Sequence, residues 1–120
     1  MRKFLFMLLL SYASLFAFEE LTVQNFDDKI KGKNVIVDIY ATWCPPCKIV
    51  AQNLEEFDVI KPDNVEVYKV NFEEQADIAH KYGVKSLPTL LFFKDGKLVD
   101  GHVGIVSSEK LLEASKSNFN

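Results

Sequence analysis

The only two cysteines of this 120-residue chain lie three positions apart, at the junction between an apolar run and a helical pattern. The apolar run covers residues 34–40 and is β-branched on both faces, which is typical of a central strand buried on both sides. From Pro45 onward the apolar residues recur at helical spacing, and proline is favoured in the first turn of a helix. The pattern therefore predicts a strand followed at once by a helix, with Cys44 at the N-terminal end of that helix.

The place of Cys44 before the helix favours redox chemistry. Unpaired backbone N–H groups and the positive end of the helix dipole stabilise a thiolate, which is the form of cysteine that attacks disulfides. Cys47 lies one turn further along, within bonding reach, and is expected to be the more enclosed of the two. We therefore predict that Cys44 is the nucleophile and that Cys47 is the resolving thiol, which displaces the reduced substrate from a mixed disulfide.

Three other interpretations of the cysteine pair stay open at this point. An inert structural disulfide is disfavoured, because a bridge that closes so short a loop constrains the unfolded chain little. A metal-handling module could hold copper(I) between the two sulfurs, although two sulfurs give an incomplete shell for zinc. His80 and His102 do not complete such a shell, since their spacing fits no common zinc pattern. A redox-inert module could instead bind partners through the groove around the cysteines.

Residues 1–17 have the order of a secretory signal peptide: a basic head, an apolar run from Phe4 to Leu10, and small residues up to Ala17. An uncleaved membrane anchor is the alternative. The apolar stretch is interrupted by two serines, however, and is shorter than the roughly 20 residues that span a bilayer. We expect cleavage after Ala17, which predicts a single domain over residues 18–120 in the periplasm or another exported compartment.

Charge and length restrict the partners and the number of domains. A chain of about this length suits one domain with one modest core. Arg2 and Lys3 are the only charged residues of the predicted signal peptide, so cleavage would take the formal net charge from −3 to −5. A mildly acidic domain without a basic cluster argues against nucleic acid and anionic membrane surfaces as partners.

Beyond the cysteines, strand and helix patterns alternate along the chain. Strands are predicted at 21–23, 34–40, 65–71, 89–93 and 98–103. Helices are predicted at 45–58, at 74–82 and from Ser107 or Ser108 onward, and a brief helix capped by Asn25 or Asp27 is predicted to end at Gly32. Asp95-Gly96, between the last two strands, is the strongest short hairpin signal. Parallel crossovers come first and one antiparallel hairpin comes last, which predicts an α/β fold around a mixed sheet.

With these motifs in this order, the chain resembles the thioredoxin family over about residues 20–118. The resemblance is carried by residues 37–48, 69–71, 82–84, 87–89 and 93–96 and by the late Gly104. It implies a thioredoxin fold, in which helices flank a central mixed β-sheet on both faces, and an oxidoreductase that needs no cofactor or metal. It also implies protein disulfides as substrates and a membrane-bound or soluble electron donor for re-reduction. We expect a monomer.

The resemblance assigns a role to a charged residue of the apolar run. Asp38 would be a buried carboxyl, and burial raises the pKa of a lone carboxyl. In thioredoxins the matching Asp lies beneath the cysteines and accepts the proton of the resolving cysteine, beside a Lys that matches Lys69. From the residues alone, Asp38 could instead reach solvent at a strand end, and Lys69 could be a solvated strand residue.

The resemblance also predicts a substrate groove. Thioredoxins carry a cis proline packed against the cysteine pair, and Leu87-Pro88-Thr89 matches it, so we expect a cis bond before Pro88. The backbone beside this proline would pair with an extended substrate segment. The residues predicted to line the groove are Trp43, Pro46, Leu87, Pro88 and Gly104. For Trp43, partial packing in the core is nearly as well supported.

Two positions depart from the family pattern. Family members commonly have Gly-Pro between the cysteines, whereas this chain has Pro45-Pro46. Pro45 has no N–H to direct at the Cys44 sulfur, but it also stiffens the turn, so the reduction potential stays open. Many members also have a proline five residues after the second cysteine, where this chain has Gln52. That change affects the shape of the helix more than the chemistry.

Overall fold

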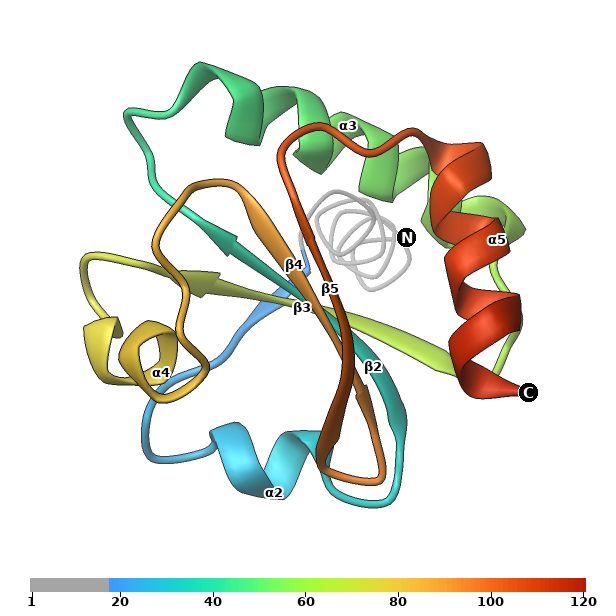
Figure 1. Ribbon diagram of the computed structural model, residues 1–120, viewed down its shortest axis with the longest axis horizontal. Coiled ribbons are helices and arrows are strands. Elements are labelled where there is room, and N and C mark those ends of the chain that lie inside the picture. The colour runs from blue at the N-terminus through green and yellow to red at the C-terminus, as the bar shows by residue number, and fades with distance from the viewer. Residues whose placement is uncertain (1–17) are drawn as a thin grey trace, which may run out of the picture.

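The computed structural model describes residues 18–120, so the predicted signal peptide lies outside the described residues. In this part of the chain, one mixed sheet of five strands has the order β1-β3-β2-β4-β5. Its strands are β1 (Glu19–Glu20), β2 (Asn34–Tyr40), β3 (Val65–Asn71), β4 (Thr89–Lys94) and β5 (Lys97–Val103). The helices are α2 (Phe26–Ile30), α3 (Pro45–Ile60), α4 (Ala76–Lys81) and α5 (Ser108–Phe119). Helices α3 and α5 cover one face of the sheet, and α2 and α4 cover the other (Figure 1).

The central position of β2 follows from its apolar sequence. It pairs in parallel with β3 and antiparallel with β4, and its residues 35–39 are all buried. Val35, Val37 and Ile39 pack into the cluster on the side of α2 and α4. Ile36 packs into the cluster under α3 and α5. Because side chains alternate along a strand, Asp38 shares the face of Ile36 and is directed toward α3.

Most predicted elements are confirmed, some with small changes at their ends. The strands at 34–40 and 65–71 have the predicted bounds, and α3 continues two residues past the predicted end. The hairpin turn has Asp95 at φ +50° and Gly96 at φ +79°, the left-handed conformations that a two-residue turn requires. Ser107 is the N-cap of α5, where its side chain accepts the Lys110 N–H at 3.2 Å.

The first strand differs from the prediction, because β1 lies earlier in the chain than residues 21–23. Only the Leu21 N–H continues the ladder, by donating to the Lys69 carbonyl at 2.9 Å. The Thr22 N–H donates instead to the Asn25 side chain at 2.8 Å. This hydrogen bond turns the chain into α2, so the segment cannot remain extended.

Helix α4 is shorter than the predicted span of 74–82. The Asn71 side chain accepts the N–H groups of Glu73 at 2.9 Å and Glu74 at 3.2 Å, which holds these residues in a turn before the helix. Gly83 follows the helix at φ +69°, as its capping pattern predicts. Within residues 18–120, no helix is long and apolar enough to cross a bilayer.

The packing of α3 on the sheet gives a first testable prediction. Leu54 is a residue of α3 and is fully buried against the sheet. Leu54→Ala should therefore lower the free energy of unfolding by about 2–5 kcal/mol, through lost burial and a residual cavity. Val59, on the same helix, is 85 % exposed, and Val59→Ala should stay within about 0.5 kcal/mol of the wild type. Urea denaturation of both variants measures the difference. Equal stabilities would contradict this account of the core.

Candidate active site

The cysteine pair lies where β2 passes into α3. Cys44 is the N-cap residue of α3 and forms a disulfide bond with Cys47, with the Cα atoms 5.3 Å apart. The Cys47 backbone N–H donates to the Cys44 Sγ at 3.2 Å. Because Pro45 and Pro46 have no N–H, this is the first N–H that the helix can offer to the sulfur. The Cys44 sulfur therefore lies at the positive end of the helix.

Both cysteines are almost completely covered in the disulfide form. Cys44 is 4 % exposed and Cys47 is 3 % exposed. They form a small cluster with Ala41, against which Tyr40 and Leu87 pack. The expected difference in enclosure between the two cysteines is therefore absent here. The physical reason is packing, because Ala41, Tyr40 and Leu87 cover both cysteines together.

A carboxyl group is buried beneath the pair. Asp38 is 4 % exposed, and its Oδ1 has no hydrogen-bond partner. Together with Cys47 and Lys69, Asp38 lines a cavity of about 290 Å³. The structure therefore places Asp38 inside the protein and not at a solvated strand end.

Two opposing effects act on the pKa of Asp38. Burial disfavours the carboxylate and raises the pKa from its ordinary value of 3.8 to about 7, against the positive charge of Lys69, which lowers it. Lys69 is half-buried and pairs directly with Asp38 in the register of β2 and β3. A carboxyl group that titrates near neutral pH can accept a proton and return it under physiological conditions. The geometry therefore allows proton exchange with Cys47 across the cavity.

The raised pKa predicts an unusual pH dependence of stability. Between about pH 4 and pH 7 the folded protein holds a proton on Asp38 that the unfolded chain has lost, so stability falls as the pH rises through this window. Asn cannot ionise, so Asp38→Asn should be more stable than the wild type at pH 8. The gain should be on the order of 4 kcal/mol at most and should vanish near pH 4.

Urea denaturation at pH 4, 6 and 8 measures this difference between Asp38→Asn and the wild type. Asp63 is exposed before β3 and provides the matched control, because Asp63→Asn removes the same charge without a buried carboxyl. A gain for Asp38→Asn that does not change with pH would contradict the ionisation of Asp38 inside the fold.

The predicted groove residues gather around the disulfide. The peptide bond between Leu87 and Pro88 is cis. Pro88 is buried, and its carbonyl accepts the Gly104 N–H at 2.9 Å, which joins the two loops on this side of the site. Leu87 packs against the cysteine cluster, and Pro46 is exposed in the first turn of α3.

Trp43 is exposed next to Cys44 and is not part of the core. It is 67 % exposed, and its Nε1–H donates to Glu73 Oε1 at 2.9 Å. The hydrogen bond fixes the ring while leaving most of its surface free. A broad aromatic surface therefore lies next to the disulfide.

The family model for thioredoxin matches residues 17–117 of this chain, which include the disulfide, the buried Asp38 and the cis proline. The chain belongs to the thioredoxin family. Thioredoxin of Bacillus subtilis (strain 168) is 41 % identical over 92 residues, which cover 77 % of this chain and 88 % of that protein. Thioredoxin of Staphylococcus aureus (strain Mu50) is 40 % identical over 97 residues, which cover 81 % and 93 %. The crystal structure of Malassezia sympodialis thioredoxin matches with a TM-score of 0.75 and 34 % identity, covering 85 % of this chain and 90 % of that chain.

Family membership and the disulfide-bonded pair make this chain a protein-disulfide oxidoreductase of the thioredoxin type. The mixed sheet with helices on both faces is the thioredoxin fold, as predicted. Within residues 18–120, no three His, Cys, Asp or Glu side chains are grouped so that they could hold a metal ion. His102 instead contacts Asp100, with 3.0 Å between Nε2 and Oδ2.

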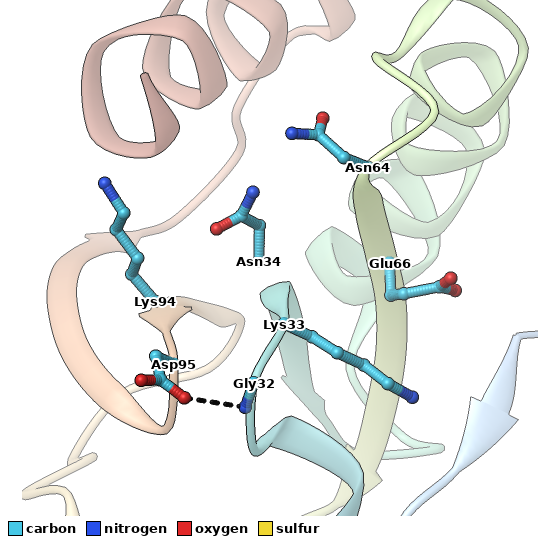
Figure 2. Close-up of a pocket in the computed structure, with 7 residues that line it drawn as sticks. All are labelled: Gly32, Lys33, Asn34, Asn64, Glu66, Lys94 and Asp95. Carbon is cyan, nitrogen blue, oxygen red and sulfur yellow. Dashed lines mark hydrogen bonds between the residues drawn. The ribbon is translucent and has the colours of Figure 1, made fainter.

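A larger cavity, of about 370 Å³, lies at the opposite end of the thioredoxin sheet. Its lining residues are Gly32, Lys33, Asn34, Asn64, Glu66, Lys94 and Asp95 (Figure 2). Asn34 begins β2, whereas the disulfide follows the end of this strand. Figure 2 shows the Lys33 and Lys94 side chains pointing in different directions, and the Asp95 carboxylate accepts the Gly32 N–H at 2.8 Å. The larger of these two cavities therefore lies away from the disulfide, and cavity size does not identify the active site.

Two residues of the site were missed by reasoning from the sequence. The sequence pattern places Tyr40 in an apolar strand, yet its side chain lines the same cavity as Asp38. The sequence gives no role to Glu73 beyond that of a surface residue, yet its carboxylate accepts the hydrogen bond from the Trp43 ring. Both lie at or just after the carboxyl end of a strand that adjoins the site, and this position is the signal that could have identified them.

Proposed function

We propose that this protein reduces disulfide bonds of exported proteins, with Cys44 as the nucleophile and Cys47 as the resolving thiol. The observation that carries the proposal is the Cys47 N–H that donates to the Cys44 sulfur at the start of α3. In the dithiol form, the same N–H and the helix dipole favour a thiolate at Cys44. The second sulfur is close enough to close the ring, since Cα atoms 5.3 Å apart fit a disulfide.

The proposed cycle transfers two electrons to the substrate. The Cys44 thiolate attacks one sulfur of the substrate disulfide, and the other substrate sulfur leaves with the electron pair and takes up a proton. Cys47 then gives its proton to the Asp38 carboxylate, and its sulfur attacks Cys44. The bond between Cys44 and the substrate breaks, so the second substrate sulfur also leaves with an electron pair and takes up a proton. Lys69 supports this step because its charge favours the carboxylate form of Asp38.

The predicted groove residues would give the substrate a place to bind beside the disulfide. An extended segment would pair with the backbone beside Pro88, as a strand does at a sheet edge. Trp43 and Pro46 would contact it from the side of α3, and Leu87 and Gly104 from the opposite side. The cycle leaves Cys44 and Cys47 as a disulfide, so a membrane-bound or soluble dithiol donor must reduce them again.

Export is the part of the proposal that depends on residues 1–17. Its support is the order of basic, apolar and small residues in this segment, together with a family match that begins at residue 17. We expect a monomeric mature domain over residues 18–120. N-terminal sequencing of the protein from the exported fraction should give Phe18. A membrane-bound chain that begins at Met1 would overturn cleavage and favour the anchor.

Catalytic turnover tests the proposed activity. With dithiothreitol as the reductant, the purified protein should accelerate the reduction of insulin disulfides over many turnovers. Its equilibrium reduction potential should lie near the roughly −270 mV of thioredoxin. A potential far above this value would assign the protein to disulfide formation instead. A protein that carries bound copper and turns over poorly would favour metal handling, and a phenotype that survives replacement of both cysteines by Ser would favour redox-inert binding.

A further inference from the structure

Three charged residues form a row across neighbouring strands beneath the active site. In the sheet order β1-β3-β2, Glu20 of β1 pairs with Lys69 of β3, and Lys69 pairs with Asp38 of β2. Residues that are partners across strands lie on the same face of a sheet. Lys69 therefore has an acidic residue as its neighbour on each adjoining strand, one exposed at the edge of the sheet and one buried at the cavity.

Tyr40 connects the two outer strands of this row. It follows Asp38 by two positions and so shares its face of β2. The Tyr40 hydroxyl donates to the Glu20 carboxylate. Because β3 lies between β1 and β2, this hydrogen bond must cross β3 on the face that carries Lys69. The Lys69 Nζ lies 5.6 Å from the centre of the Tyr40 ring, within the range of a cation–π contact.

We propose that Glu20 and Tyr40 form a strap across β3 that holds the Lys69 ammonium beside Asp38, and that both are positioning residues for proton transfer from Cys47. This inference rests on the proposed role of Asp38 as the proton acceptor. The Tyr40 ring walls the cavity that Asp38 and Lys69 line, so the strap and the proton acceptor belong to one compartment.

The strap acts on Asp38 through Lys69, because Lys69 is the charge that lowers the pKa of Asp38. Lys48 also lines the cavity, from α3, and Cys47 faces Asp38 from the same helix. On the β4 side the partner of Asp38 is Leu90, which carries no charge. Without the strap, the long Lys69 side chain would be free to turn toward solvent, and the carboxylate form of Asp38 would lose its favourable neighbour.

The strap persists over the pH range in which Asp38 titrates. Burial, followed by the hydrogen bond to Glu20, raises the pKa of the Tyr40 hydroxyl above its ordinary value of 10.0. Tyr40 therefore remains a hydrogen-bond donor near neutral pH, where Asp38 exchanges its proton. A change in the titration of Asp38 in a strap variant can then be assigned to Lys69 and not to ionisation of Tyr40.

Tyr40→Phe removes the strap while keeping the ring and every formal charge. The titration of Asp38 is followed by carbon NMR of the labelled carboxyl group in the dithiol protein. The Lys69→Met variant serves as the reference, because its Asp38 midpoint shows the shift expected when the Lys69 charge is lost completely. A nearby opposite charge shifts a carboxyl pKa by about 1–3 units, so partial release of Lys69 should move the Asp38 midpoint up by roughly 0.5 or more. At a pH below the midpoint, resolution of the mixed disulfide should slow by about threefold.

Two comparisons separate the strap from a general structural effect. In the Lys69→Met background, Tyr40→Phe should cause no further shift of the Asp38 midpoint. Glu20→Ala should raise the midpoint, whereas Glu19→Ala, with the same change of charge on the same strand, should not. An unchanged midpoint in Tyr40→Phe, or the same shift with and without Lys69, would overturn the strap. If Asp38→Asn resolves mixed disulfides at the wild-type rate, the proton-acceptor role of Asp38 fails instead, whatever the NMR titration shows.

Discussion

Cys44→Ser is expected to abolish the reduction of insulin disulfides, leaving only the uncatalysed reaction with dithiothreitol. The attacking group at this position must be a sulfur anion, which the Cys47 N–H and the positive end of α3 stabilise. A serine hydroxyl is not ionised near neutral pH and cannot form a disulfide with the substrate. The helix-end N–H would still be present in the variant, but it would have no thiolate to stabilise.

The control for Cys44→Ser is the reduced wild-type protein, because neither has the Cys44–Cys47 bond. Both therefore lack the stabilisation of roughly 2 kcal/mol that the chain-entropy model assigns to a loop this short, and they should unfold at nearly the same urea concentration. Loss of activity at unchanged stability would then reflect the missing nucleophile. Residual turnover at the wild-type rate would contradict the role of Cys44.

Cys47→Ser should stop the cycle after its first half. The substitution keeps the backbone N–H of residue 47, so the environment of the Cys44 sulfur is retained. Cys44 should therefore still attack a substrate disulfide, but no second thiol would displace the product. In the absence of added thiol we expect one substrate molecule bound per protein molecule, and multiple turnover should be lost.

Mass spectrometry under non-reducing conditions measures this adduct, and peptide mapping should locate it at Cys44. Dithiothreitol should release it, since a mixed disulfide is reducible. The Cys44→Ser variant serves as the matched control, because it should form no adduct at all. Adducts that map elsewhere, or sustained turnover without Cys44–substrate bonds, would contradict the resolving role of Cys47.

The elements that the sequence predicted well are those defined by neighbouring residues. The strand at 34–40 and the helix that starts at Pro45 have the predicted starting points, because β-branching, proline and helical spacing act within a few residues. The first strand was misplaced for the opposite reason. Two residues suffice for β1 because they pair with β3, a segment far along the chain, and no local pattern marks that pairing.

The residues around the cysteines divide in the same way. The place of Cys44 at a helix N-terminus follows from the local sequence. The resemblance to thioredoxin predicted that Asp38, Lys69 and Pro88 belong to the site. Neither source indicated that Tyr40 contacts Glu20. This contact joins the ends of two strands that are separated by a third, so it depends on the order of strands in the sheet.

The chemistry available to this protein is thus encoded locally, in two sulfurs at the start of one helix. A helix end presents its free N–H groups and its dipole wherever the helix is placed, so the sequence alone was sufficient for this conclusion. The environment of Asp38 was determined by the assembled sheet. Asp38 is buried and lies beside Lys69 because β2 packs between β3 and β4 and under α3. A carboxyl group is removed from water only when segments that are distant in the sequence pack together around it.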